Sequence, residues 1–157
     1  MARHYLDHAS TSPPRPEVVD AMTAALRGDA GQDPSRDAGP GVGLGDPGRI
    51  HAEGMRARAL VEDARDQIAG FFGARSREVV FTSGATEAIA TATWGAAERG
   101  STIVTPSVEH SAVRSSVEAL VEAGGHRSIA VGVDALGHVD PDEVVGRIRD
   151  DTALVHL

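Results

Sequence analysis

The sequence contains no cysteine and no lysine, and all 15 basic side chains among its 157 residues are arginines. Without lysine no side chain can form a Schiff base. Without cysteine none can supply a thiolate nucleophile, a disulfide or a cysteine-ligated metal site. The chain therefore cannot perform these reactions by itself. The sequence also gives no disulfide evidence for an oxidising compartment, so we expect a cytoplasmic location.

Aromatic residues are also scarce, and the sequence has neither a net positive charge nor a long apolar run. One Trp, one Tyr and three Phe are present, so the core must be built from Val, Ile, Leu and Ala. The 23 acidic residues give a net charge of −8, which argues against nucleic-acid binding because that requires a basic face. No apolar run approaches the roughly 20 residues of a membrane-spanning helix. The first segment, MARHYLDHAST, has no apolar stretch of the kind found in signal peptides, so we do not expect it to be a secretory signal.

The sequence pattern divides the chain into three regions. Residues 1–27 give an N-terminal arm and a helix with Pro in its first turn, and apolar residues follow at helical spacing: Val18, Met22, Ala25 and Leu26. Residues 28–49 hold seven Gly and three Pro with no period, so they predict a loop. Residues 50–157 begin with a long amphipathic helix, whose expected apolar stripe is Ala57, Leu60, Val61, Ala64, Ile68, Phe71 and Phe72.

Four short apolar strands alternate with helices in the rest of that region. The expected strands are 78–83, 101–107, 127–133 and 152–157, and the helices between them include one that begins at the Asp140-Pro141 pair. This alternation predicts an α/β fold with a mostly parallel sheet covered by helices on both faces. The sequence stops inside an expected buried strand, whereas chain ends usually lie at the surface, so we expect a truncated domain.

The junction FTSGATEA, at residues 81–88, is the strongest local signal for chemistry. An apolar strand runs into Gly84, and a helix is expected to begin near Thr86. Backbone N–H groups at a helix start, with a glycine and a threonine hydroxyl, can bind a phosphate. The alternative is an ordinary turn in which Ser83 or Thr86 only caps the helix. The motif is neither a P-loop nor GxGxxG.

His110 follows an expected strand across a Pro-containing turn in VTPSVEHSAV. This position is at the carboxyl edge of the sheet, where open α/β sheets bind ligands, and a histidine there can stack on a planar ligand and move protons. The alternative is a surface histidine that caps the next helix. The other six histidines have no metal-ligand spacing, so no metal site is expected. A hydrolase nucleophile elbow is also absent from the sequence.

Five segments occur in a characteristic order: HYLDHASTSPPRPEVVDAM, GDPGRIHAEGMRARALVEDARDQIAGFFGA, REVVFTSGATEA, STIVTPSVEHSAV and GHVDPDEVVGRIRDDTALVHL. Together they resemble the cysteine desulfurases, fold-type I enzymes of the class V aminotransferase group that use pyridoxal 5′-phosphate (PLP). The resemblance covers essentially the whole sequence. It implies the N-terminal part of the large domain of such an enzyme.

The resemblance also implies roles for individual residues. Gly84, Ala85 and Thr86 would hold the phosphate of PLP, and His110 would stack on its pyridine ring and assist proton transfer on the substrate. An N-terminal segment would approach the substrate end of the pocket: Asp7, His8, Ala9, Ser10 and Thr11. Asp46 stands where the family usually has Asn, and residues 29–43 look expanded, so contacts from this loop are not carried over.

Members of this family are more than twice as long, and their Schiff-base lysine and persulfide cysteine lie beyond position 157. The resemblance thus predicts a fragment of a cysteine desulfurase, which converts L-cysteine to L-alanine and an enzyme persulfide. We expect it to be inactive alone, either as a truncated gene product or as one part of an enzyme whose complementary C-terminal half is encoded separately. The complete enzyme would be a homodimer that passes sulfur to an acceptor protein, as in iron–sulfur cluster assembly.

Two other functions are compatible with the same sequence features. The chain would carry the same cofactor motifs if it came from another class V enzyme, such as a selenocysteine lyase or an isopenicillin-N-epimerase-like enzyme. It would also lack lysine and cysteine if it were a non-catalytic remnant used for binding or assembly.

Overall fold

The computed structural model describes residues 4–8, 10–28 and 43–157. Within them the chain forms two units, Met1–Val80 and Phe81–Leu157, which we describe separately. Most of the predicted loop 28–49 lies outside the described residues. No helix in the described part of the chain is both long enough and apolar enough to cross a lipid bilayer.

The N-terminal unit contains α1 (Pro16–Arg27), α2 (Ala52–Phe72) and the short 3-10 helix η1 (Ser76–Glu78). Helix α1 begins with proline at its first position, as predicted, and ends at Gly28, whose φ of 81° lies in the left-handed region. Helix α2 ends at Gly73 in the same way, with φ 65°. Both helix ends are therefore explained by local sequence signals.

The apolar stripe of α2 is mostly exposed within its own unit, contrary to the burial expected from its spacing. Only Gly54, Ala57 and Ala69 are buried in this helix, whereas Phe71 and Phe72 are 83% and 74% exposed. These two rings contact each other edge to face, with centroids 5.0 Å apart. The spacing predicted the helix correctly, but within this unit η1 is the element that packs against it.

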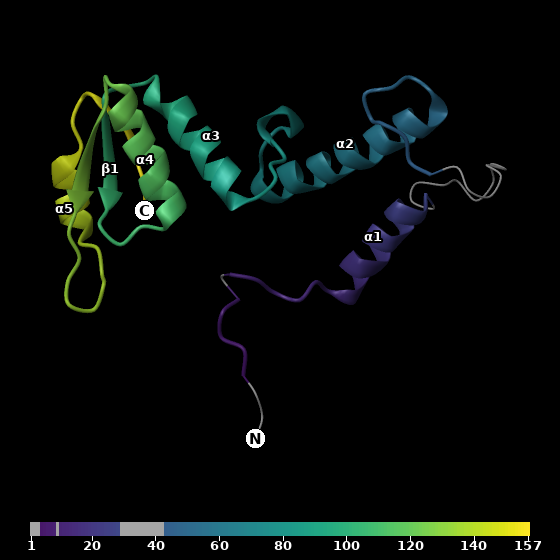
Figure 1. Cartoon of the computed structure of the whole chain (residues 1–157), viewed down its shortest axis with the longest axis horizontal. Coiled ribbons are helices and arrows are strands. Elements are labelled where there is room, and N and C mark those ends of the chain that lie inside the picture. The colour runs from purple at the N-terminus through teal and green to yellow at the C-terminus, as the bar shows by residue number, and fades with distance from the viewer. Residues whose placement is uncertain (1–3, 9, 29–42) are drawn as a thin grey trace. The chain divides into compact units, whose positions relative to one another are not determined.

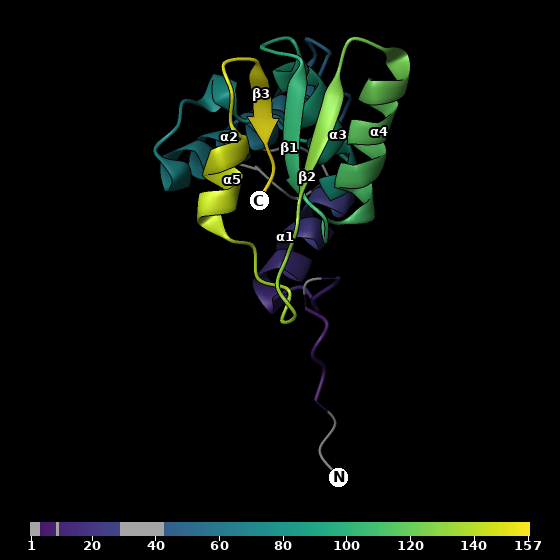
Figure 2. The same cartoon turned by 90° about the vertical axis from the view of Figure 1, so that its left-hand side faces the viewer.

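The C-terminal unit is a three-stranded parallel sheet with helices on both faces (Figure 2), which confirms the predicted architecture. The strand order is β2-β1-β3, with β1 in the centre. Its elements in chain order are α3 (Ala85–Ala97), β1 (Thr102–Pro106), α4 (Ser111–Ala123), β2 (Arg127–Val131), α5 (Pro141–Arg147) and β3 (Thr152–Val155).

Alternate residues of β1 build the two halves of the core. Ile103 packs with buried residues of α3 and α4, including Ala97 and Val117, whereas Val104 packs on the opposite face with Val144 of α5. Figure 1 shows α4 and α5 on opposite sides of the central strand. This two-sided burial is typical of parallel sheets and explains the short, continuous apolar strands in the sequence.

Two strand predictions differ from the structure. The strand expected at residues 78–83 is absent: η1 ends at Glu78, and residues 79–82 have no strand assignment. A strand forms only where a neighbouring strand pairs with it, and no strand of the described sheet pairs with these residues. Val80 is accordingly 72% exposed. The last strand, β3, is half-buried rather than buried, since β1 pairs with it on one side only.

Asp151 joins the beginnings of all three strands. Its Oδ2 accepts hydrogen bonds from the hydroxyls of Ser101 and Thr102, both at 2.7 Å, and lies 2.9 Å from Nη2 of Arg127. These interactions, chiefly the hydroxyl bonds from Thr102 and Ser101, lower the pKa of the Asp151 carboxyl. The carboxylate thus stabilises the strand register at the amino edge of the sheet, opposite the edge where His110 lies.

Candidate functional site

The turn before α3 leaves the start of that helix open. Gly84 is the N-cap residue, has an extended backbone and provides no side-chain cap. A Cβ at Gly84 would meet no atom within 4 Å, so the space beside it is free for a ligand. Backbone N–H groups of the first helical turn, at Ala85 and Thr86, therefore retain the capacity to bind an anion.

Glu87 fixes the conformation of this turn. Its Oε2 accepts hydrogen bonds from the backbone N–H and the hydroxyl of Ser83, both at 2.6 Å, and these bonds lower the pKa of its carboxyl. The hydroxyl of Thr82 donates to the Gly84 carbonyl at 3.1 Å. Neither Ser83 nor Thr86 caps α3, so the interpretation of this motif as a turn capped by one of them is wrong.

His110 is the N-cap residue of α4. Its Nδ1 accepts a hydrogen bond from the Ala112 N–H at 3.1 Å, and its own backbone N–H donates to the Glu109 carboxylate. Since Nδ1 is the acceptor, the proton of the neutral ring is on Nε2. The capping interpretation is confirmed, and it does not compete with a ligand role, because capping uses only one ring nitrogen.

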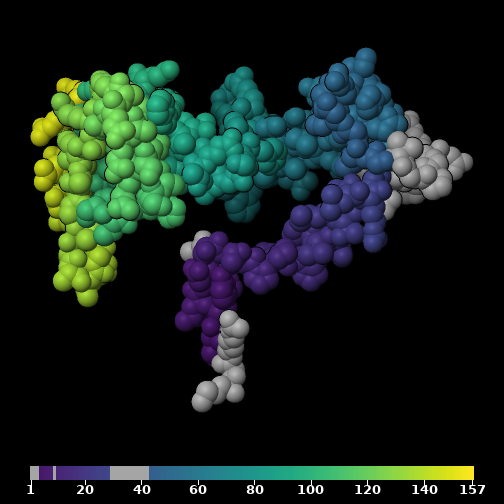
Figure 3. Space-filling model, viewed as in Figure 1, coloured from purple at the N-terminus to yellow at the C-terminus, as the bar shows by residue number. Residues whose placement is uncertain are grey.

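Thr86 and His110 line the same groove between α3 and α4, which has a volume of about 450 Å³. Figure 3 shows α4, in light green, at the surface of this unit. The lining includes no acidic side chain, lysine or arginine among the described residues; it consists of Thr86, Ala90, Trp94, His110, Ser111, Ala112, Ser115, Ser116 and Ala119. The groove thus has a polar mouth at two helix N-termini and a largely apolar wall.

Several groove residues were not predicted from the sequence. Ala90 and Trp94 follow Thr86 at intervals of four residues, so a helical-face count from Thr86 would have found them. Ser116 is 7% exposed, and its Oγ has no hydrogen-bond partner among the described residues. No sequence signal identifies that feature, because it depends on how α3 packs against α4.

The predicted substrate-side segment belongs to the N-terminal unit, and Asp7, His8, Ser10 and Thr11 are exposed. The Asp7 carbonyl accepts hydrogen bonds from the Tyr5 hydroxyl and from the N–H groups of Ser10 and Thr11. His8 Nδ1 lies 2.9 Å from the Ser12 hydroxyl. Ala9 lies outside the described residues. These contacts define a local turn, and the substrate role of the segment stays a prediction.

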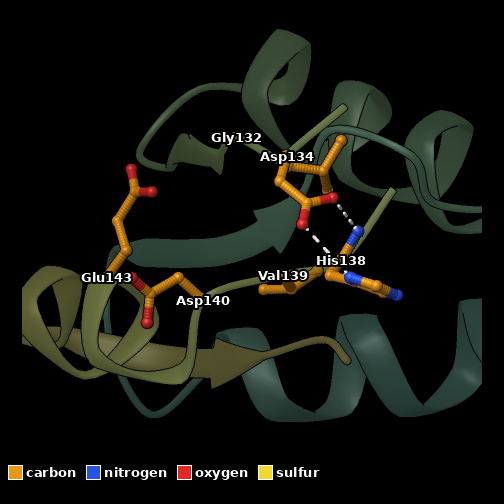
Figure 4. A pocket seen from close by; sticks show the side chains of 7 residues that line it. Gly132, Asp134, His138, Val139, Asp140 and Glu143 are labelled. Atoms are coloured by element: carbon orange, nitrogen blue, oxygen red, sulfur yellow. Dashed lines mark hydrogen bonds and ion pairs between the residues drawn. The ribbon is translucent and has the colours of Figure 1, made fainter. Parts of the chain in front are cut away.

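A second hollow, of about 410 Å³, lies between the turn after β2 and the start of α5 (Figure 4). Asp134 in its wall accepts backbone hydrogen bonds from His138 and Leu136 and pairs with the His138 ring, and these bonds lower the pKa of its carboxyl. Asp140 caps α5. The described residues hold no cluster of His, Asp or Glu suited to a metal ion. These side chains therefore stabilise local structure.

Residues 4–157 match the family model described as aminotransferase class-V. The chain belongs to this family. Among its relatives, it is 38% identical to a putative cysteine desulfurase IscS 1 of Bacillus subtilis and 36% identical to a cysteine desulfurase IscS of Dictyoglomus turgidum. These matches cover 99% and 98% of the chain but only 38% and 36% of the relatives.

Solved structures of other proteins share the fold of this class V chain. A NifS-like protein matches with a TM-score of 0.75 and 29% identity, over 93% of the chain and 37% of that protein. DndA from Streptomyces lividans matches with a TM-score of 0.69 and 29% identity, over 97% of the chain and 40% of that protein. The chain thus spans somewhat more than a third of the length of the proteins it matches.

Proposed function

We propose that the chain is the N-terminal part of a PLP-dependent cysteine desulfurase, which releases sulfur from L-cysteine and leaves L-alanine. The observation that carries the proposal is the meeting of Thr86 and His110 in one groove at the uncapped start of α3. The named relatives support it, because the Bacillus subtilis protein is a putative cysteine desulfurase and the Dictyoglomus turgidum protein is a cysteine desulfurase. PLP is the cofactor of such enzymes.

The residues of the groove mouth fit the phosphate of PLP. The first N–H groups of α3 and the Thr86 hydroxyl would donate to its oxygens, and Gly84 leaves the approach open. The positive ends of the α3 and α4 dipoles favour an anion there without a basic side chain. An unpartnered hydroxyl at Ser116 in the same groove is a further feature that a bound group can satisfy.

His110 would face the cofactor ring. Its cap to Ala112 holds the imidazole in one orientation, so a planar ring can stack on it, and Nε2 is the ring nitrogen left to hydrogen-bond the substrate and to assist proton transfer. PLP, when bound, supplies the electron sink that weakens bonds at the substrate Cα. The segment Asp7, His8, Ala9, Ser10 and Thr11 is proposed to approach the substrate.

The chemistry assigned to lysine and cysteine must come from elsewhere, since neither residue occurs among these 157. We propose that a C-terminal part of the same enzyme supplies the Schiff-base lysine and the persulfide thiolate. The complete enzyme would then be a homodimer that passes its sulfur to an acceptor protein. In this proposal the enzyme acts in the cytoplasm and binds neither nucleic acid nor a membrane.

A turnover assay tests the proposal. The purified 157-residue chain is mixed with PLP and L-cysteine, and alanine is quantified; no alanine is expected. The assay is repeated with the C-terminal part of the Bacillus subtilis relative as a separate polypeptide, and alanine release is expected. Alanine from the chain alone would overturn the fragment proposal. No alanine from the mixture, although the two polypeptides co-purify, would favour a non-catalytic binding role.

A further inference from the structure

Ser116 is the residue of the α3–α4 groove whose hydrogen bonding is incomplete. It is 7% exposed, its Oγ is shielded from solvent, and no described residue pairs with that atom. Burying a hydroxyl without a partner costs folding free energy, so such groups are uncommon in folded proteins. A hydroxyl maintained at this cost indicates a partner that binds in the groove.

The composition of the groove indicates the chemistry of that partner. Four hydroxyls line it, on Thr86, Ser111, Ser115 and Ser116, and both helices that form it begin at its mouth. Hydroxyl and backbone N–H donors together with two positive dipole ends suit an oxyanion. A serine side chain can rotate between staggered rotamers, so Oγ of Ser116 can turn toward a ligand with little strain.

We propose that Ser116 is a phosphate-binding residue, whose hydroxyl donates to the same ligand phosphate as the Thr86 hydroxyl and the first turn of α3. This inference rests on the proposed function for the identity of the ligand. It adds a donor from α4 to the phosphate site, so that the two helices bind the anion jointly.

The test compares Ser116→Ala with Ser128→Ala, at an exposed position of β2 that does not line the groove. Isothermal titration calorimetry measures the affinity for three probes: PLP, inorganic phosphate and pyridoxal, which lacks the phosphate. We expect S116A to weaken PLP and phosphate binding about tenfold or more and to leave pyridoxal unaffected. S128A should change each affinity less than twofold. Ser116→Thr, which keeps the hydroxyl, should bind PLP and phosphate with an affinity close to that of the wild type.

Urea unfolding of the ligand-free variants separates this role from a structural one. If the hydroxyl has no partner in the free protein, S116A should be as stable as the wild type or more stable. A less stable S116A with unchanged phosphate affinity would overturn the proposal. So would equal losses of affinity in S116A and S128A. If the wild type binds neither PLP nor phosphate, the proposed function itself fails; if Thr86→Val weakens binding and S116A does not, only the role of Ser116 fails.

Discussion

His110 caps α4 with one ring nitrogen, and the proposed function gives the same ring a second role in ligand binding. Nδ1 accepts the Ala112 N–H and so completes the first turn of α4, and His110 is exposed and lines the groove. A residue that only capped the helix could be replaced by any good N-cap residue. The proposed ligand role requires the imidazole itself. Substitution can therefore distinguish the two roles.

We predict that His110→Ala lowers the free energy of unfolding by about 1 kcal/mol, because a cap is lost, whereas His110→Asn stays close to the wild type. Asparagine accepts the same N–H bond but has no ring to stack. Urea unfolding followed by Trp94 fluorescence measures this, since Trp94 lies in the same unit. Equal destabilisation by both substitutions would show that the ring, rather than its acceptor atom, stabilises α4.

At the scale of secondary structure, most helices and strands follow from local signals. Proline at the start of α1 and α5 and glycine after α1, α2 and α4 mark their ends in the sequence. The expected strand at 78–83 fails for a different reason. Its apolar residues are suited to a sheet, but strand formation depends on a partner that is not nearby in sequence, and no local pattern specifies one.

The network at Asp151 makes the sheet sensitive to acid. The folded-state pKa of this carboxyl is below its usual value of 3.8, mainly through the Thr102 and Ser101 hydroxyl bonds. Its contribution to stability is therefore complete above that value and is lost as the pH falls through the folded pKa. We predict that Asp151→Asn is less stable than the wild type at neutral pH and that the difference shrinks below about pH 4.

Urea unfolding at a series of pH values, again followed by Trp94 fluorescence, measures this difference. Asp150→Asn is the matched control, because Asp150 is the adjacent exposed carboxylate. A constant difference between wild type and D151N from neutral to acidic pH would contradict the role of the ionised carboxylate.

For the whole molecule, some features of the fold and of the groove follow from the sequence and others only from the packing of helices. The α/β class and the joint location of Thr86 and His110 were predictable from the sequence, although the strand expected before Gly84 is absent and the packing of α3 against α4 brings the two residues into one groove. Two features were not predictable, namely the groove wall with Trp94 and the unpartnered hydroxyl of Ser116. Both depend on the packing of α3 against α4. The exposed Phe71 and Phe72 of α2 likewise contradict the burial that helical spacing predicts.

The family assignment and the composition together define the central claim. The chain belongs to class V, covers 38% of its Bacillus subtilis relative and contains neither lysine nor cysteine, and the proposed function gives it a phosphate site without the residues for turnover. Such a chain should bind PLP reversibly and without a covalent bond to a side-chain amine. Binding, rather than catalysis, is therefore the property that tests the claim in the chain alone.

The most direct measurement is a titration of the chain with PLP, followed by the fluorescence of Trp94, the only tryptophan of the sequence, which lines the groove. We predict saturable quenching that Thr86→Val weakens about tenfold or more, because a hydrogen bond to a charged group is lost. Thr91→Val, an exposed position on the same helix outside the groove, should leave the affinity unchanged. Absence of saturable quenching, or equal effects of the two substitutions, would contradict a phosphate site at the start of α3.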